Sequence, residues 1–212
     1  MTTLLCACAT KESFHTLEPQ KVDTYHAPYS GPKSSIAIGN FDNKSNYLQG
    51  IFSSGSSQLG NQAKTILKSH LQSTNRFVVL DRENLDGLKQ EANLRGQTQK
   101  LLGARYVIGG AVTEFGRKET GDKQLFGIAG SGKTQTAYSK ITLTVIDVVS
   151  SAVIYSTQGA GEYSLSNREI IGFGSQAGYD ATLNGKVLNL AITEAVNHLV
   201  HDLQNGVWSI QE

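Results

Sequence analysis

Along the 212-residue chain, segments whose hydrophobic residues recur at the spacing of a β-strand alternate with segments whose hydrophobic residues recur at the spacing of an α-helix. Runs rich in β-branched and aromatic residues predict strands at 35–41, 77–80, 106–115, 140–149 and 153–157. The run 77–80 is apolar throughout, which predicts a buried strand. Apolar residues at helical spacing predict helices at about 58–73 and 182–203. A shorter helix should carry Leu85, Leu88 and Leu94, with Asp81 as its cap. This alternation predicts an α/β or α+β domain.

Two segments, 116–138 and 158–179, do not fit that domain. Each follows a predicted strand and contains neither a helical period nor core-like side chains. Segments of this length without regular structure are uncommon in compact domains and usually functional. Each is long enough for two strands of about 9–11 residues, the length that crosses a bilayer when tilted. Both segments are therefore predicted to be long membrane β-hairpins.

The run Gly127–Thr134 matches the phosphate-loop pattern G-x-x-x-x-G-K-[ST] letter for letter. Such a loop needs a helix that starts at its Lys-Thr pair and directs free N–H groups at the phosphates. Alternating residues after Thr134 predict a strand instead, so we expect no nucleotide site. Within a membrane hairpin, Lys133 should face a water-filled lumen or the lipid headgroups, because the bilayer midplane would cost it about 2–4 kcal/mol.

Composition narrows the partners and the chemistry. A formal net charge of +1 argues against a nucleic-acid partner, which needs a basic face. The only cysteines are Cys6 and Cys8, so disulfide, zinc and thiol chemistry are not expected in the body of the chain. His198 and His201 could face one ligand, but no third ligand is visible. No catalytic constellation emerges, and we expect neither an enzyme nor a bound cofactor or metal.

The N-terminus carries a lipidation signal. Leu5-Cys6-Ala7-Cys8 resembles a bacterial lipobox in which Cys8 is the lipidated residue. Met1–Leu5 lacks the basic and apolar parts of a secretory signal, so either the start lies inside a longer precursor or the chain has been trimmed. The alternative is a tail with two chance cysteines. Residues 9–33 are polar and predict an extended linker, which divides the chain into 1–33 (lipobox and linker) and 34–212 (the folded domain).

Three sequence blocks, 79–88, 103–115 and 178–192, resemble the curli-secretion-channel family, the CsgG/HfaB lipoproteins. The resemblance is collinear from about Lys33 to the C-terminus and includes the lipobox. It implies an outer-membrane lipoprotein, lipid-anchored at the periplasmic face, with a periplasmic α/β domain. It also implies that each subunit gives two β-hairpins to a shared transmembrane β-barrel. Four strands in lipid leave unpaired edges, so only a ring of subunits closes the sheet. About nine chains would match a barrel of about 36 strands.

The resemblance also implies a function and a constriction. The family exports protein or peptide in curli-type transport, which here would be independent of nucleotide. Its partners would be other copies of the chain, the exported polypeptide and accessory periplasmic proteins. The loop 45–57 corresponds to the family's channel constriction, but an ungapped match places Gly50, Ser54 and Gly55 there instead of aromatic and asparagine residues. The constriction candidates are Asn46, Tyr47, Phe52 and Ser54. The alternative function is a non-pore periplasmic lipoprotein that acts as a binding or assembly module at the cell envelope.

Overall fold

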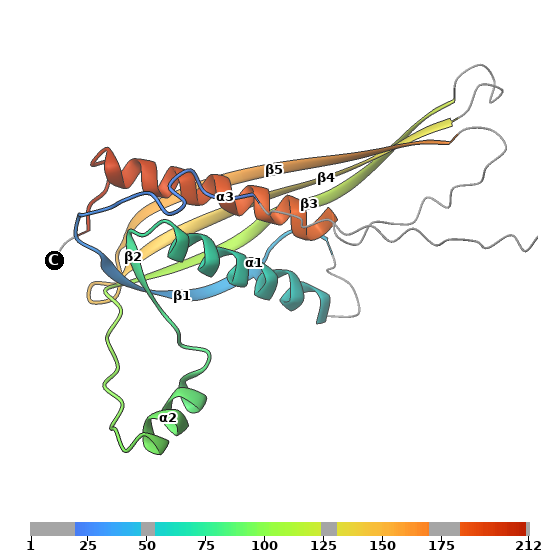
Figure 1. The fold of residues 1–212 in the computed structure, drawn as a ribbon. Helices are drawn as coiled ribbons and strands as arrows, with labels where there is room; N and C mark the ends of the chain where they lie inside the picture. The colour runs from blue at the N-terminus through green and yellow to red at the C-terminus, as the bar shows by residue number, and fades with distance from the viewer. Residues whose placement is uncertain (1–19, 48–53, 124–130, 170–182, 211–212) are drawn as a thin grey trace, which may run out of the picture.

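The computed structural model describes residues 20–47, 54–123, 131–169 and 183–210. One mixed sheet and two long helices form the body (Figure 1). In chain order the elements are β1 (Ser34–Asn43), α1 (Ser54–Ser73), β2 (Phe77–Leu80), α2 (Leu85–Leu94), β3 (Tyr106–Lys123), β4 (Ser131–Asp147), β5 (Val153–Glu169) and α3 (Leu183–Gln204). The predicted α/β class is confirmed.

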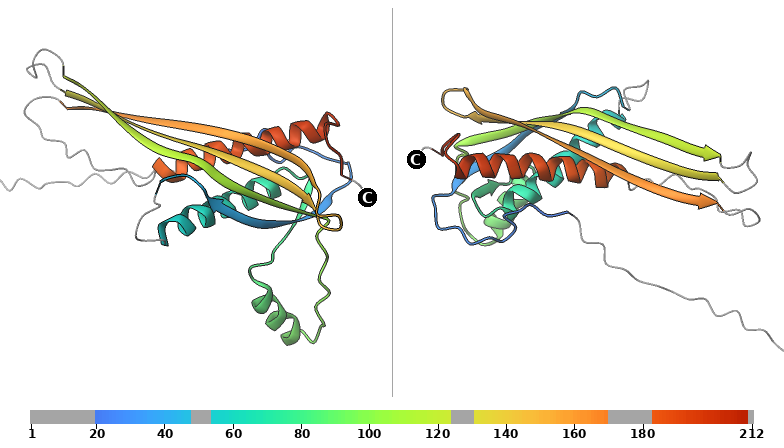
Figure 2. Two further views of the ribbon diagram at one scale, coloured as in Figure 1. Left: turned by 180° about the vertical axis from the view of Figure 1, so that it is seen from behind. Right: turned by 90° about the horizontal axis from the view of Figure 1, so that it is seen from above.

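The sheet has the strand order β2-β1-β3-β4-β5. β1 pairs in parallel with β2 and β3, whereas β3, β4 and β5 pair antiparallel. Helices α1 and α3 lie on the same face of this sheet (Figures 1 and 2). Strand β4 shows why they pack there: Ala137, Ile141, Leu143 and Val145 are buried, while their even-numbered neighbours are not. Side chains alternate along a strand, so one face of β4 enters the core under the helices.

The apolar stripe of α3 forms the centre of that core. Val187, Ala191, Ile192, Ala195 and Leu199 have no exposed surface. Burying a large aliphatic side chain stabilises a fold by about 1.5–3 kcal/mol, so this helix is a main source of stability. The apolar stripe of α3 therefore lies in the core.

The structure differs from the prediction at strand β2 and at the start of helix α2. β2 was expected to be buried, but it is an edge strand, and Val78 is 41% exposed. Asp81 was expected to cap the following helix, yet the N-cap position is Asn84. The Asp81 carboxylate instead accepts hydrogen bonds from the backbone N–H groups of Glu83 and Asn84 in the turn before α2.

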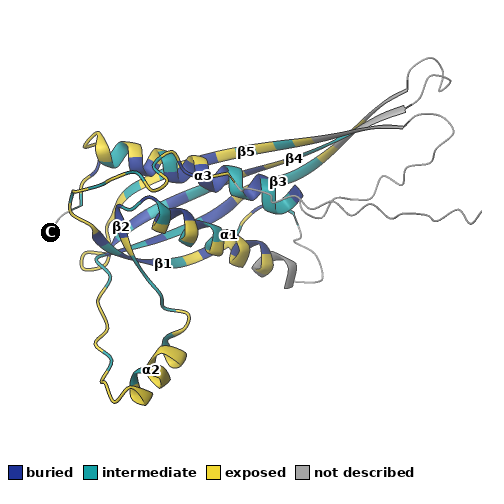
Figure 3. Ribbon diagram, in the orientation of Figure 1, coloured by how far each residue is buried: buried dark blue, intermediate teal, exposed yellow. Residues whose placement is uncertain are grey.

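Residues 81–105 project from the body and carry α2, which has no buried residue (Figures 1 and 3). Residues 9–33 were predicted to form an extended linker, but the described part of this segment packs against the body. Val22 is 3% exposed in the core, and the N–H of Asp23 donates to Asn197 Oδ1 at 2.9 Å. Within the described residues, none of the helices is long and apolar enough to span a membrane.

Candidate functional site

Strands β3, β4 and β5 continue well past the body, and we call this continuation the extension. It comprises the residues beyond the paired row Val112, Ile141 and Gly159, that is 113–123, 131–140 and 160–169. Pairing persists to the row Lys123, Ser131 and Glu169. The three strands leave both helices behind (Figures 1 and 2). The predicted strands ended near 115, 140 and 157, so each is about ten residues longer than its apolar pattern indicated.

Both outer edges of the extension lack a strand partner among the described residues. On one side, β1 pairs with β3 only as far as Asn43 and Val112. On the other side, β5 pairs with β4 alone. Unpaired strand edges present free N–H and C=O groups, which readily accept another strand.

Helix α3 blocks the edge of β5 where the extension begins. The N–H of Ala160 donates to Glu194 Oε2 at 2.7 Å, and His198 Nδ1 lies 3.0 Å from the carbonyl oxygen of Gln158. Glu194 and His198 are one helical turn apart, so a single face of α3 caps both groups. The imidazole must hold its proton on Nδ1 to donate this bond. In the part of the chain that the structure describes, His, Cys, Asp and Glu side chains form no group of three or more that could hold a metal ion.

Two glycines allow α3 to lie directly on β5. A Cβ at Gly159 would lie 2.1 Å from the carbonyl oxygen of Ala191 and 2.5 Å from the nitrogen of Ala195. A Cβ at Gly161 would meet Leu190 Cβ at 2.7 Å. Glycine within a strand often marks a close backbone approach. These two positions therefore fix the depth at which the helix seats against the sheet.

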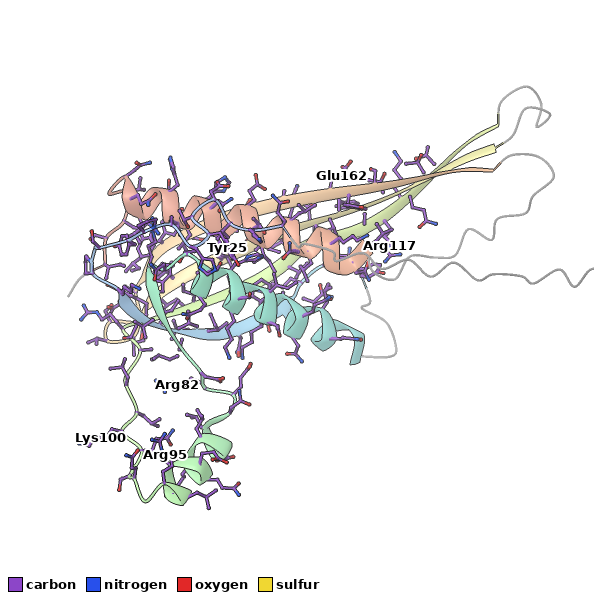
Figure 4. All side chains as sticks on the ribbon, viewed as in Figure 1. Tyr25, Arg82, Arg95, Lys100, Arg117 and Glu162 are labelled. Carbon is purple, nitrogen blue, oxygen red and sulfur yellow. The ribbon has the colours of Figure 1, made fainter. Side chains whose placement is uncertain are left out.

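A second set of contacts holds the base of the extension. Arg117 of β3, which is labelled in Figure 4, donates from Nε and Nη2 to Asn184 Oδ1, at 3.0 and 2.6 Å. Asn184 Nδ2 lies 3.5 Å from the hydroxyl of Tyr47, whose ring packs on Phe115 at 4.6 Å between centroids. The first turn of α3, the first hairpin strand and the start of the loop before α1 meet here.

The two faces of the extension differ near this base. On one face, Lys118 and Glu162 are exposed, and the hydroxyls of Thr136 and Ser164 lie 2.9 Å apart. Figure 4 shows Glu162 pointing away from the helices. On the opposite face, Ala137 is fully buried and the ring of Tyr163 is covered by the Lys186 ammonium at 5.0 Å. One face is therefore polar and open, and the other begins as a continuation of the core.

The structure brings together only some of the predicted site residues. Tyr47 lies at the base of the extension, Asn46 is exposed beside it, and Ser54 is the first residue of α1. Lys133 is in β4, paired with Gly121 and Asn167. Cys8 and Phe52 lie outside the described residues, as do residues 124–130 of the first predicted hairpin and residues 170–179 of the second. The constriction and lipidation roles stay predictions.

The phosphate-loop match is not followed by a helix, as predicted. Lys133 and Thr134 are extended residues near the start of β4, so no helix N-terminus is available there to bind a phosphate. The sequence reasoning missed Arg117, Asn184 and Glu194. The glycine pair 159 and 161 within a strand was the one local signal that could have indicated where a helix packs closely.

His70 makes a buried polar link between the two long helices. It is 7% exposed on α1, and its Nε2 lies 2.8 Å from Asn189 Oδ1 and 3.2 Å from Thr193 Oγ1 of α3. Burial lowers the pKa of this imidazole, and the hydrogen bond to Asn189 opposes that shift in part. The helix pair therefore favours the neutral form of the ring.

Comparison with known proteins identifies the family. The sequence profile described as "Curli production assembly/transport component CsgG" matches residues 19–211. A protein of Neisseria meningitidis serogroup B that carries the provisional name lipoprotein NMB1126/NMB1164 is 58% identical over 204 residues, which cover 96% of this chain and 91% of that protein.

Two solved structures are more distant. The PelC dodecamer from Paraburkholderia phytofirmans has a TM-score of 0.38 and 18% identity, covering 80% of this chain and 93% of its own. Lipoprotein GNA1162 from Neisseria meningitidis has a TM-score of 0.30 and 13% identity, covering 82% of this chain and 99% of its own. Scores this low carry no argument about function.

Proposed function

Because this chain belongs to the CsgG family, we propose that it is a lipid-anchored subunit of a ring-shaped outer-membrane channel that exports protein or peptide. The Neisseria relative is named a lipoprotein, and Cys8 stands in a lipobox-like sequence. A single lipid group gives only modest anchoring, so a second membrane contact is needed. The extension and the second predicted hairpin would supply it.

The extension is the observation that carries this proposal. Its three strands leave the body together. The row Arg117, Ala137 and Tyr163 still contacts α3, and each strand continues for six described residues past it, whereas a tilted strand that crosses a bilayer has about 9–11. An unsatisfied backbone group in lipid costs several kcal/mol. If the extension enters a membrane, the edge of β3 must pair with another strand, and so must the edge of β5, to which the second predicted hairpin would add the fourth strand of each subunit. Copies of the same chain, joined edge to edge in a closed ring of about nine subunits, would satisfy them.

The two faces of the extension fit a barrel wall near its base. A barrel of this kind is polar inside and apolar outside. The face of Lys118, Thr136 and Glu162 would line the water-filled lumen, and the face of Ala137 and Tyr163 would turn outward. Transport would need no nucleotide, since the strand after Lys133 offers no phosphate-binding helix.

Reconstitution tests the channel. The detergent-extracted full chain in a planar bilayer should give stepwise conductance, and Lys118→Glu should shift its ion selectivity towards cations. Lys89→Glu makes the same charge change on the exposed helix α2 and should leave selectivity unchanged. Absence of conductance from protein that is inserted in the bilayer would overturn the channel.

A second candidate is a non-pore envelope lipoprotein that binds or assembles a partner. One observation favours it: the outward face of the extension offers only Phe115, Ala137 and Tyr163 as apolar side chains among those described, and Phe115 and Ala137 are buried, whereas a lipid-facing band about 25 Å tall needs more. Ring particles that give no conductance would support this candidate over the channel.

A further inference from the structure

Arg76, between α1 and β2, is a buried cation that has no counter-ion among the described residues. It is 4% exposed, and the elements that flank it, α1 and β2, meet at the end of the body from which the extension points away (Figure 1). Its Nη1 donates to the carbonyl oxygen of Thr74 at 2.7 Å, and its guanidinium lies 4.6 Å from the ring centroid of Tyr29. Its Nε has no hydrogen-bond partner in the part of the chain that the structure describes.

These contacts leave the charge of Arg76 uncompensated. A guanidinium has five N–H donors, and a buried charge is costly unless an opposite charge and hydrogen bonds satisfy it. The ring of Tyr29 contributes only about 0.5–2 kcal/mol. No carboxylate of the described residues forms an ion pair with this guanidinium. The site is complete only when an anion arrives.

The anion has a place to bind. Arg76 lines a cavity of about 380 Å³ whose walls are the N-terminal segment, the end of α3 and the residues that follow this helix. Leu203, Trp208 and Ile210 give it apolar walls, while the Gln204 amide and the Ser209 hydroxyl add polar groups that can donate. Among the described residues that line it, none is acidic.

We propose that this cavity binds one carboxylate side chain of an acidic polypeptide segment, held by Arg76. A planar guanidinium fork matches the two oxygens of a carboxylate. A single cation balances a single negative charge, whereas a phosphate dianion would remain half neutralised beside apolar walls. The cavity is at the small end of ligand sites, which suits one side chain with its flanking backbone.

The carboxylate has two sources with the same chemistry. Glu212 follows two residues after Ile210 in the sequence, which is a reach of about 7 Å, although its position lies outside the described residues. Alternatively, the side chain comes from another polypeptide that docks at this end of the molecule, away from the extension. This binding site does not depend on the proposed channel.

Trp208 provides the readout, because it is the only tryptophan of the chain and lines the cavity. The full chain in detergent is titrated with N-acetylglutamate α-amide, with the neutral N-acetylglutamine α-amide as the matched probe. We expect a saturable change in tryptophan fluorescence with the acidic probe alone. Arg76→Met should weaken that binding about tenfold or more, because a hydrogen-bonded charge contributes about 1.5–3 kcal/mol.

Glu212→Gln separates the two sources. Tighter probe binding by this variant than by the wild type identifies Glu212 as the resident carboxylate. Equal binding assigns the site to an incoming polypeptide. If Arg76→Met does not fold, as judged by circular dichroism, Arg76→Lys keeps the charge without the fork and should also bind more weakly. The proposal is overturned if neither the wild type nor Glu212→Gln responds saturably, if both probes act alike, or if the folded Arg76 variant binds as the wild type does.

Discussion

Replacing Gly159 by alanine should separate α3 from β5. The added methyl group would lie 2.1 Å from the carbonyl oxygen of Ala191 and 2.5 Å from the nitrogen of Ala195. Both atoms belong to the helix backbone, so no side chain can rotate away and the helix itself must shift. Overpacking of a core costs about 1–3 kcal/mol, and we expect the upper end of that range here. For a chain of this size, 1 kcal/mol lowers Tm by about 2–4 °C, so Tm should fall by about 6–12 °C.

The shift should also open the edge of β5. The same helix face supplies Glu194 and His198, which cap Ala160 and Gln158 at 2.7 and 3.0 Å. A helix displaced by about 1 Å, the amount that relieves such an overlap, would stretch both bonds beyond hydrogen-bonding distance. Amide hydrogen exchange at Ala160 should therefore accelerate in the variant.

Gly87→Ala is the matched control. It adds the same methyl group to the exposed helix α2, where nothing lies within 4 Å. Alanine is a better helix former than glycine by about 0.5–1 kcal/mol, so this variant should be as stable as the wild type or slightly more stable. Thermal unfolding followed by circular dichroism measures both. Equal Tm values for Gly159→Ala and the wild type would refute the close-packing argument.

Further predictions concern the junctions and the sites. The folded-state pKa of His70 is below its ordinary 6.5. Its contribution to the free energy of unfolding is therefore present above pH 6.5 and is lost as the pH falls through the folded-state pKa. In urea titrations, His70→Gln should lose less stability between pH 7.5 and pH 5 than the wild type, and an equal loss in both proteins would contradict this role of His70. Asn184→Ala leaves a half-buried Arg117 guanidinium with fewer acceptors and should lower the free energy of unfolding by about 1–3 kcal/mol; a value near zero would contradict the junction. Cys8→Ser should abolish labelling by radioactive palmitate and release the protein from membranes, whereas Cys6→Ser should not. Lys133→Ala should leave ATP binding at the background level of the wild type, and a loss of measurable binding would restore the phosphate-loop interpretation.

The sequence predicted the body of the fold well where one face is buried. The alternation in β4 and the apolar stripe of α3 both arise from contact with one continuous core, so their periods appear directly in the sequence. Strand β2 was misjudged because an apolar run of four residues reads the same in the centre of a sheet and at its edge. Its exposure depends on which strand lies beside it, and that information is not local.

The extension was predicted as two hairpins, but its strands were not predicted residue by residue. Its pairing depends on backbone hydrogen bonds between polar residues, for which hydrophobic period is a weak signal. The junction at its base could not be predicted at all. Arg117 and Asn184 are 67 residues apart, and only the seating of α3 on β5 brings them together. Gly159 and Gly161, which allow α3 to pack closely on β5, can be read from the sequence, but the sequence does not show that α3 is the element they contact.

Imaging the detergent-extracted full chain by single-particle electron microscopy tests the central claim most directly. If the extension and the second predicted hairpin join a barrel that is shared between copies, the particles should be closed rings of about nine subunits with a central opening. Monomers, or dimers without a closed wall, would contradict the account.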